Sequence, residues 1–148
     1  MQMLSPHFTL AECFHTAHAN IDNTPDAVAL AHLPLTAMAA EPFRAQFGPL
    51  FVSSGYRCPR LNAAIGGVHD SAHIYGCALD LVPLTPGVTV TQMVAWGVAN
   101  GLIFDQIIDE GASEVAWMHL GICRPGFELT PRREALVYRN GVYSQFNP

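Results

Sequence analysis

Two histidines and one aspartate place the strongest constraint on how this chain can fold. His73 and Asp80 lie on either side of Gly76, and His119 follows much later in the chain. Two imidazoles and one carboxylate can supply three protein ligands to a zinc ion and leave a fourth position for water, which is the arrangement of a catalytic zinc site. A fold that uses them in this way must turn at Gly76 and bring the segment around His119 close to Asp80.

The composition is that of one compact domain. The chain has 148 residues, of which 50% are hydrophobic and 13% are charged, so it is long enough for one core and too short for two ordinary domains. We therefore expect a single domain over residues 1–148, and a monomer. Seven basic residues, all arginine, against twelve acidic ones give a net charge of -5, which disfavours nucleic-acid binding because phosphates require a clustered basic surface.

The N-terminus and the cysteines bear on the compartment. The N-terminus lacks the basic segment and apolar run of a signal peptide, and no apolar stretch reaches the roughly 20 residues that a membrane span requires. We therefore expect a soluble chain with no signal peptide and no membrane span. Cys13, Cys58, Cys77 and Cys123 form no C-x-x-C pair and are expected to be reduced and mostly buried. Cys77 is assigned to packing, since it faces away from Asp80 on an alternating strand.

Helices are predicted mainly in the first part of the chain. The pattern Thr9-x-x-Glu12 is a capping box that predicts a short helix. Thr24 is the predicted cap of one long or two abutting helices that extend to Gly48, with a break or kink at the prolines inside. Further helices are predicted over 59–65 and 91–100.

Strands are predicted mainly in the second part of the chain. The apolar runs fall at 50–54, 77–82, 104–109 and 115–122, and the last two are expected to form a hairpin. Asn140-Gly141 predicts a second hairpin within 136–143. Because helices come first and strands later, the pattern favours an α+β fold, with N-terminal helices packed on a small, mainly antiparallel sheet that carries the zinc site.

Three motifs occur in the order that is typical of one known family. Ser71-x-His73-x-x-Gly76-x-Ala78-x-Asp80 is preceded by Ser54-Gly55-Tyr56-Arg57 and followed by Trp117-x-His119. Together they resemble the signature of the zinc D-alanyl-D-alanine carboxypeptidases, peptidase family M15, which also contains phage L-alanyl-D-glutamate endolysins. The resemblance covers most of the chain. It implies a hedgehog/DD-peptidase type of fold and Zn²⁺ held by His73, Asp80 and His119.

The resemblance also implies a carboxylate that acts as general base, just upstream of the last histidine. Glu110 and Glu114 are the two candidates. Neither has the Glu-x-x-His spacing of the vancomycin-resistance dipeptidases, which belong to the same family, since position 116 is Ala116. Glu110 is the first choice because it resembles the hedgehog-like placement before a short turn. A solvated turn carboxylate is the alternative role for either residue.

Five further residues are candidates for a role at the site. Arg57 is expected either to hold the scissile carbonyl and its developing negative charge or to pair with a carboxylate as a structural arginine. Ser71 would bind substrate or cap the loop before His73. Trp117 would line the cleft or pack in the core. Asp105 or Gln106 is expected to orient one of the imidazoles.

The function that follows is zinc-dependent hydrolysis of a peptidoglycan stem peptide, as a carboxypeptidase or an endolysin-like endopeptidase that acts on the cell wall. Two other classes stay open. One is a binding or structural module that keeps zinc without turnover, and the other is a cysteine hydrolase that uses Cys77 or Cys58. Sensitivity to a chelator separates the zinc hydrolase from the cysteine hydrolase.

Overall fold

The computed structural model describes residues 1–111, 116–123 and 130–148, and over these ranges the chain forms helices and one sheet. The helices are α1 (Ala27–Phe47), α2 (Pro59–Ala64), α3 (Val90–Ala99) and the short three-ten helix η1 (Ala72–Tyr75). The strands are β1 (Leu50–Ser54), β2 (Ala78–Pro83), β3 (Gln106–Glu110), β4 (Trp117–Gly121), β5 (Glu134–Arg139) and β6 (Val142–Gln145).

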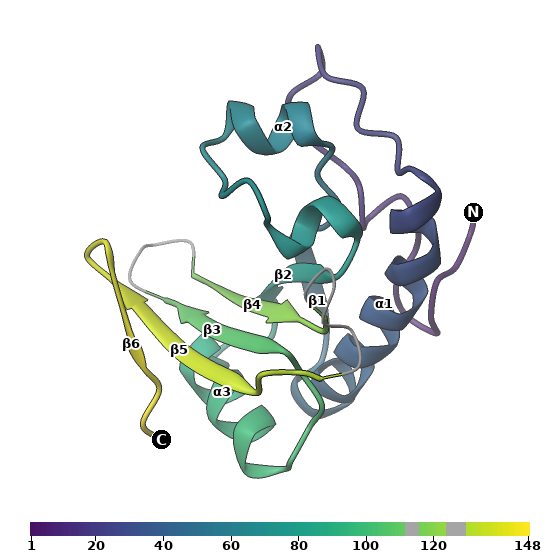
Figure 1. The fold of residues 1–148 in the computed structure, drawn as a ribbon. Helices are drawn as coiled ribbons and strands as arrows, with labels where there is room; N and C mark the ends of the chain where they lie inside the picture. The colour runs from purple at the N-terminus through teal and green to yellow at the C-terminus, as the bar shows by residue number, and fades with distance from the viewer. Residues whose placement is uncertain (112–115, 124–129) are drawn as a thin grey trace.

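The strands form a six-stranded sheet in the order β1-β2-β4-β3-β5-β6 (Figure 1). Neighbouring strands are antiparallel, except for the parallel pair β3 and β5. The predicted α+β class and the mainly antiparallel sheet are therefore confirmed. The turn between β3 and β4 falls largely outside the described residues, but their antiparallel register agrees with the predicted hairpin.

One face of the sheet packs against the core, and the opposite face carries the candidate ligands His119 and Asp80. Leu79, Leu81, Met118 and Leu120 belong to the buried cluster that includes residues of α1 and α3, and both helices contact the sheet. Because side chains alternate along a strand, the residues between them face the opposite side. His119 is one of these, and its register partners are Asp80 on β2 and Ile108 on β3.

Helix α1 differs from the prediction in its capping residue and in having no break at its two prolines. Its cap is Asp26, whose carboxylate accepts a hydrogen bond from the Ala29 amide. Thr24 is not the cap, because the side chain of Asp22 accepts hydrogen bonds from both its amide and its hydroxyl. The helix continues through Pro34 and Pro42 without a break. A proline inside a helix costs about 3 kcal/mol, and the fully buried face of α1 offsets that cost.

The predicted helix after Thr9 is a turn. The capping-box contacts form, with the Thr9 amide donating to Glu12 Oε2 and the Glu12 amide donating to Thr9 Oγ1. No α-helix follows, and residues 10–14 are turns. In α3 the capping box is made by Thr89 and Gln92, slightly before the predicted start. The terminal hairpin at Asn140-Gly141 is confirmed, and both residues have positive φ.

The cysteines depart from the expectation of reduced thiols. Cys77 and Cys123 form a disulfide, whereas Cys13 and Cys58 are free. Ala78 on β2 pairs with Gly121 on β4, so the two cysteines lie just past the same end of this strand pair, with their Cα atoms 5.6 Å apart. This separation is typical of a disulfide. The sequence could not predict the bond because β2 and β4 are not consecutive strands.

None of the described helices has the length and hydropathy needed to cross a membrane.

Candidate metal centre

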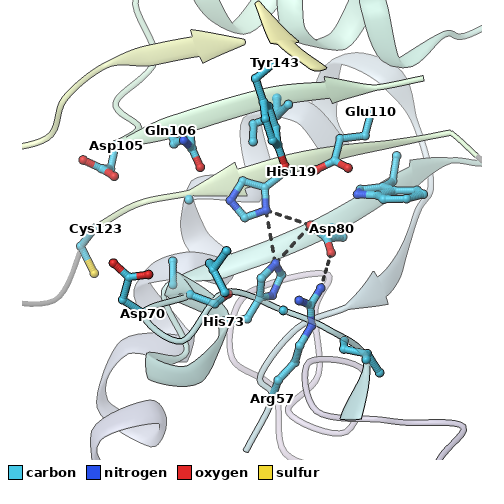
Figure 2. A pocket seen from close by; sticks show the side chains of 18 of the residues that line it. Arg57, Asp70, His73, Asp80, Asp105, Gln106, Glu110, His119, Cys123 and Tyr143 are labelled. Carbon is cyan, nitrogen blue, oxygen red and sulfur yellow. Dashed lines mark hydrogen bonds and ion pairs between the residues drawn. The ribbon is translucent and has the colours of Figure 1, made fainter. Parts of the chain in front are cut away.

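His73, Asp80 and His119 converge at one point on the open face of the sheet (Figure 2). His73 Nε2 lies 3.2 Å from His119 Nδ1 and 3.3 Å from Asp80 Oδ1. His119 Nδ1 lies 2.9 Å from Asp80 Oδ1. Three potential ligand atoms, carried by η1, β2 and β4, thus form one compact triangle.

Each of the three side chains comes from an element whose geometry follows from the local sequence. His73 lies in η1, which ends at Gly76 with φ of +70°. That left-handed conformation favours glycine. A Cβ at Gly76 would also lie 2.7 Å from the Ala29 carbonyl oxygen of α1. The turn leads directly into β2, where the register sets Asp80 beside His119.

The donor set fits a tetrahedral zinc ion. Ligand atoms about 2.0–2.2 Å from such an ion lie roughly 3.3–3.5 Å from one another, and two of the observed separations, 3.2 and 3.3 Å, are close to this range, while the third, 2.9 Å, is shorter. His73 Nδ1 donates a hydrogen bond of 2.7 Å to the Gly55 carbonyl, which leaves the lone pair on Nε2, the nitrogen that faces Asp80. A second hydrogen bond of this kind commonly fixes the tautomer of a metal-binding histidine.

The electrostatics of the triangle also suit a cation. Burial lowers the pKa of His73, although Asp80 acts in the opposite direction. Burial alone would raise the pKa of Asp80, but His73 and His119 outweigh it and hold that pKa far below its usual range. Both directions favour the forms in which these groups bind a metal, a neutral imidazole and an ionised carboxylate.

Arg57 contacts the outer oxygen of Asp80. Its Nη2 donates to Asp80 Oδ2 over 2.8 Å, and its Nε donates to Ser54 Oγ over 2.8 Å. An irregularity in β1 after Val52 sets Ser54 opposite Asp80. The structure thus shows Arg57 paired with a carboxylate, which is one of the two roles expected for it from the sequence. The same guanidinium is among the groups that line the pocket above the triangle.

The remaining predicted site residues line that pocket, which has a volume of about 640 Å³. Glu110, at the end of β3, pairs in register with Trp117 on β4. Burial, and then the charge of Asp80, raise the pKa of Glu110, and the nearby His119 and Arg57 only partly offset them. Glu114, the other candidate base, lies outside the described residues.

Ser71 also lines the pocket. It precedes η1, and its hydroxyl makes no capping bond to that helix.

Asp105 and Gln106, which were expected to orient an imidazole, contact residues from the C-terminal part of the chain. The Asp105 carboxylate accepts hydrogen bonds from Arg132, and Gln106 donates to Glu134. The Gly55 carbonyl accepts from His73 and so orients its ring. A backbone carbonyl has no signature in the sequence, so only the fold could reveal this contact.

Several pocket residues were not predicted from the sequence, among them two with polar side chains. Arg132 and Tyr143 line the same pocket as the metal triangle. The alternation within β6 and its pairing with β5 are the signals that assign Tyr143 to this face. These signals can be used only once β5 is known to lie parallel to β3.

Among the described residues, one other group has metal-ligand chemistry. It consists of His32, Cys77 and Cys123, with a ligand atom from each within 4.8 Å of the others. The two sulfurs are joined as a disulfide, so they offer no thiolate. The same bond removes Cys77 as a candidate nucleophile.

The comparisons with known proteins point to one family. No curated protein matched the chain. A family model described as Peptidase M15 matches residues 6–109, a span that contains His73 and Asp80 and ends just before Glu110. This span is more than half of the 148 residues. The chain therefore belongs to the peptidase M15 family.

Proposed function

We propose that the protein is a zinc metallopeptidase that hydrolyses peptidoglycan stem peptides. The observation that carries the proposal is the triangle of His73, Asp80 and His119 at the floor of a pocket that also contains Glu110. Membership of the peptidase M15 family supports the reaction class. The proposal includes a hedgehog/DD-peptidase type of fold, one domain over residues 1–148, a monomeric state and action on the cell wall.

His73, Asp80 and His119 would hold the zinc ion. A zinc ion bound there would act as a Lewis acid toward water and toward the scissile carbonyl. Asp80 supplies one oxygen to this position, while its other oxygen accepts from Arg57. Arg57 therefore keeps the carboxylate in the orientation that the metal site needs.

Glu110 is the proposed general base. It would take a proton from the attacking water and deliver that proton to the leaving amine. Burial raises the pKa of its carboxyl above the ordinary value, which improves its ability to accept a proton at neutral pH. Trp117, the register partner of Glu110 on β4, lines the same pocket.

Arg57 and Ser71 are the proposed groups for the substrate itself. The guanidinium of Arg57 lines the pocket beside the metal triangle, where its charge would stabilise the oxygen that becomes negative in the transition state. The hydroxyl of Ser71, at the entrance to η1, would bind the peptide.

The test combines metal analysis with digestion of purified peptidoglycan. The wild-type protein should contain one zinc ion per chain and release stem-peptide products, and a chelator should abolish that release. Glu110→Gln should lower kcat by about 10²- to 10⁴-fold and keep the zinc. Glu114→Gln is the matched control and should retain most activity.

The outcomes separate the alternatives. Zinc binding without turnover in the wild type would favour a non-catalytic module. Full activity after chelation would exclude the metallopeptidase. Loss of activity only in Glu114→Gln would transfer the role of base to Glu114. Product masses would show whether the enzyme is a carboxypeptidase or an endopeptidase.

A further inference from the structure

The C-terminal ribbon, β5 and β6, lies outside the part of the chain that matches the family model and contributes Tyr143 to the lining of the pocket. That match ends at residue 109, and the ribbon begins at Glu134. The ribbon joins the sheet through parallel pairing of β5 with β3. It thus extends the sheet on the side of β3 that faces away from β4 (Figure 1).

The ribbon is fastened to β3 by charged groups as well as by the strand ladder. Arg139 Nη2 lies 3.0 Å from Asp109 Oδ1, and Arg139 Nη1 donates to the Asp109 carbonyl over 2.8 Å. The Asp109 carboxylate also accepts from Thr91 Oγ1 of α3. These contacts hold the ribbon in a defined position relative to the strand that carries Glu110.

The register of the ribbon turns Tyr143 toward the site. Ile108 on β3 pairs with Leu136 on β5, and two residues later Tyr138 pairs with Tyr143 on β6. Register partners, and residues two apart on a strand, share a face of the sheet, so Tyr143 lies on the face that carries His119. Figure 2 shows the side chain of Tyr143 beside those of Glu110 and His119.

Tyr143 is both supported and accessible. Its ring packs on the ring of Tyr138, with centroids 4.6 Å apart. Tyr143 is nevertheless 55% exposed and lines the pocket. A supported phenol at the open side of a pocket can donate a hydrogen bond to a ligand.

We propose that Tyr143 is a substrate-binding residue, whose hydroxyl donates a hydrogen bond to a backbone carbonyl oxygen of the bound peptide. This inference rests on the proposed peptidase function. The phenol is protonated at neutral pH, and burial and then the charge of Glu110 raise its pKa further, so its hydroxyl can donate. Tyr143 acts in binding, whereas Glu110 carries the proton transfer.

The test compares Tyr143→Phe with Tyr138→Phe on a soluble stem pentapeptide. Each variant removes one hydroxyl and keeps the ring pair. Because the proposed bond is made in the bound substrate as well as in the transition state, Tyr143→Phe should raise KM about 3- to 10-fold with little change in kcat. Tyr138→Phe should stay within about twofold of the wild type, since Tyr138 is not among the residues that line the pocket.

Zinc content and the melting temperature of both variants should equal those of the wild type, which separates binding from a structural effect. A KM for Tyr143→Phe within twofold of the wild type would overturn the assignment, as would an equal rise in Tyr138→Phe. A wild-type protein that does not hydrolyse the peptide would overturn the proposed function and this inference together. Hydrolysis that is insensitive to Tyr143→Phe would overturn this inference alone.

Discussion

Asp80 is the residue on which the candidate site depends most directly. One of its oxygens faces His73 and His119, and the other accepts a hydrogen bond from Arg57. The carboxylate is nearly buried, with 5% of its residue surface exposed. A buried charge of this kind requires partners, and in this chain the partners are the candidate ligands and an arginine.

Replacing this carboxylate tests the metal site at the level of one residue. Asp80→Asn keeps the size of the side chain but removes its negative charge, so we expect zinc affinity to fall by more than about 100-fold. Competition with a chromophoric chelator measures that change. Asp70→Asn is the matched control, because Asp70 lines the same pocket but its side chain is 67% exposed. Equal zinc affinity in Asp80→Asn and the wild type would show that the carboxylate is not a ligand.

At the scale of elements, the N-terminal segment is tied to α1 by Glu41. Oε1 of Glu41 accepts from Ser5 Oγ over 2.6 Å and from the His7 amide over 2.8 Å, and Oε2 lies 2.7 Å from His7 Nδ1. Burial alone would raise the pKa of Glu41, but the bonds from Ser5 and His7 outweigh it and lower the pKa. The contact therefore stabilises the fold while Glu41 is ionised.

The sign of the pH dependence follows from that lowered pKa. The stabilisation is complete above the unfolded value of about 4.3 and is lost as the pH falls through the lower folded value. Glu41→Gln should lower the free energy of unfolding by about 1–3 kcal/mol at pH 6.5, and its deficit relative to the wild type should shrink near pH 3. Ser5→Ala removes one of the three contacts and should show a smaller deficit. Urea unfolding at both pH values measures this, and a deficit that grows on acidification would contradict it.

At the scale of the whole molecule, the disulfide closes the part of the chain that holds two of the candidate ligands. Cys77 precedes β2, Cys123 follows β4, and the loop between them contains Asp80 and His119. A cross-link over 46 residues restricts the unfolded chain and typically stabilises a fold by about 2–4 kcal/mol. The bond thus stabilises the pairing of β2 with β4 on which the metal triangle depends.

Removing the cross-link tests that contribution. The double variant Cys77→Ala/Cys123→Ala should unfold at a lower urea concentration than the wild type, by an amount that corresponds to about 2–4 kcal/mol. A phosphine reductant should have a similar effect on the wild type and none on the double variant. Cys58→Ala is the control, since Cys58 is a free cysteine. An unchanged midpoint in the double variant would show that the bond does not stabilise the fold.

Thiol labelling checks the same bond independently. Burial raises the pKa of the Cys13 thiol to about 12, so that thiol stays protonated and unreactive in the native protein. Native, unreduced protein should therefore take up iodoacetamide at the half-buried Cys58 alone. Reduced and unfolded protein should take up four equivalents, one for each cysteine.

Features that depend on near neighbours in the chain were within reach of the sequence. The Asn140-Gly141 hairpin and the glycine turn after His73 follow from local backbone preferences. The strand over Leu50–Ser54 follows from its apolar run. The motif around Asp80 also carried the family resemblance, which the family model confirms. Where local signals compete, as with Thr24 and Asp26, the sequence alone could not say which residue caps α1.

Contacts between distant segments were decided only by the tertiary structure. The sequence determined which side chains are available as ligands, because ligand chemistry belongs to the residue type. The register of β2 with β4 and of β3 with β5 decided that His119 faces Asp80, that Cys77 meets Cys123, and that Tyr143 reaches the pocket. The physical reason is that strand pairing is set by burial of a shared core face, and a shift of one residue would turn every one of these side chains to the other side.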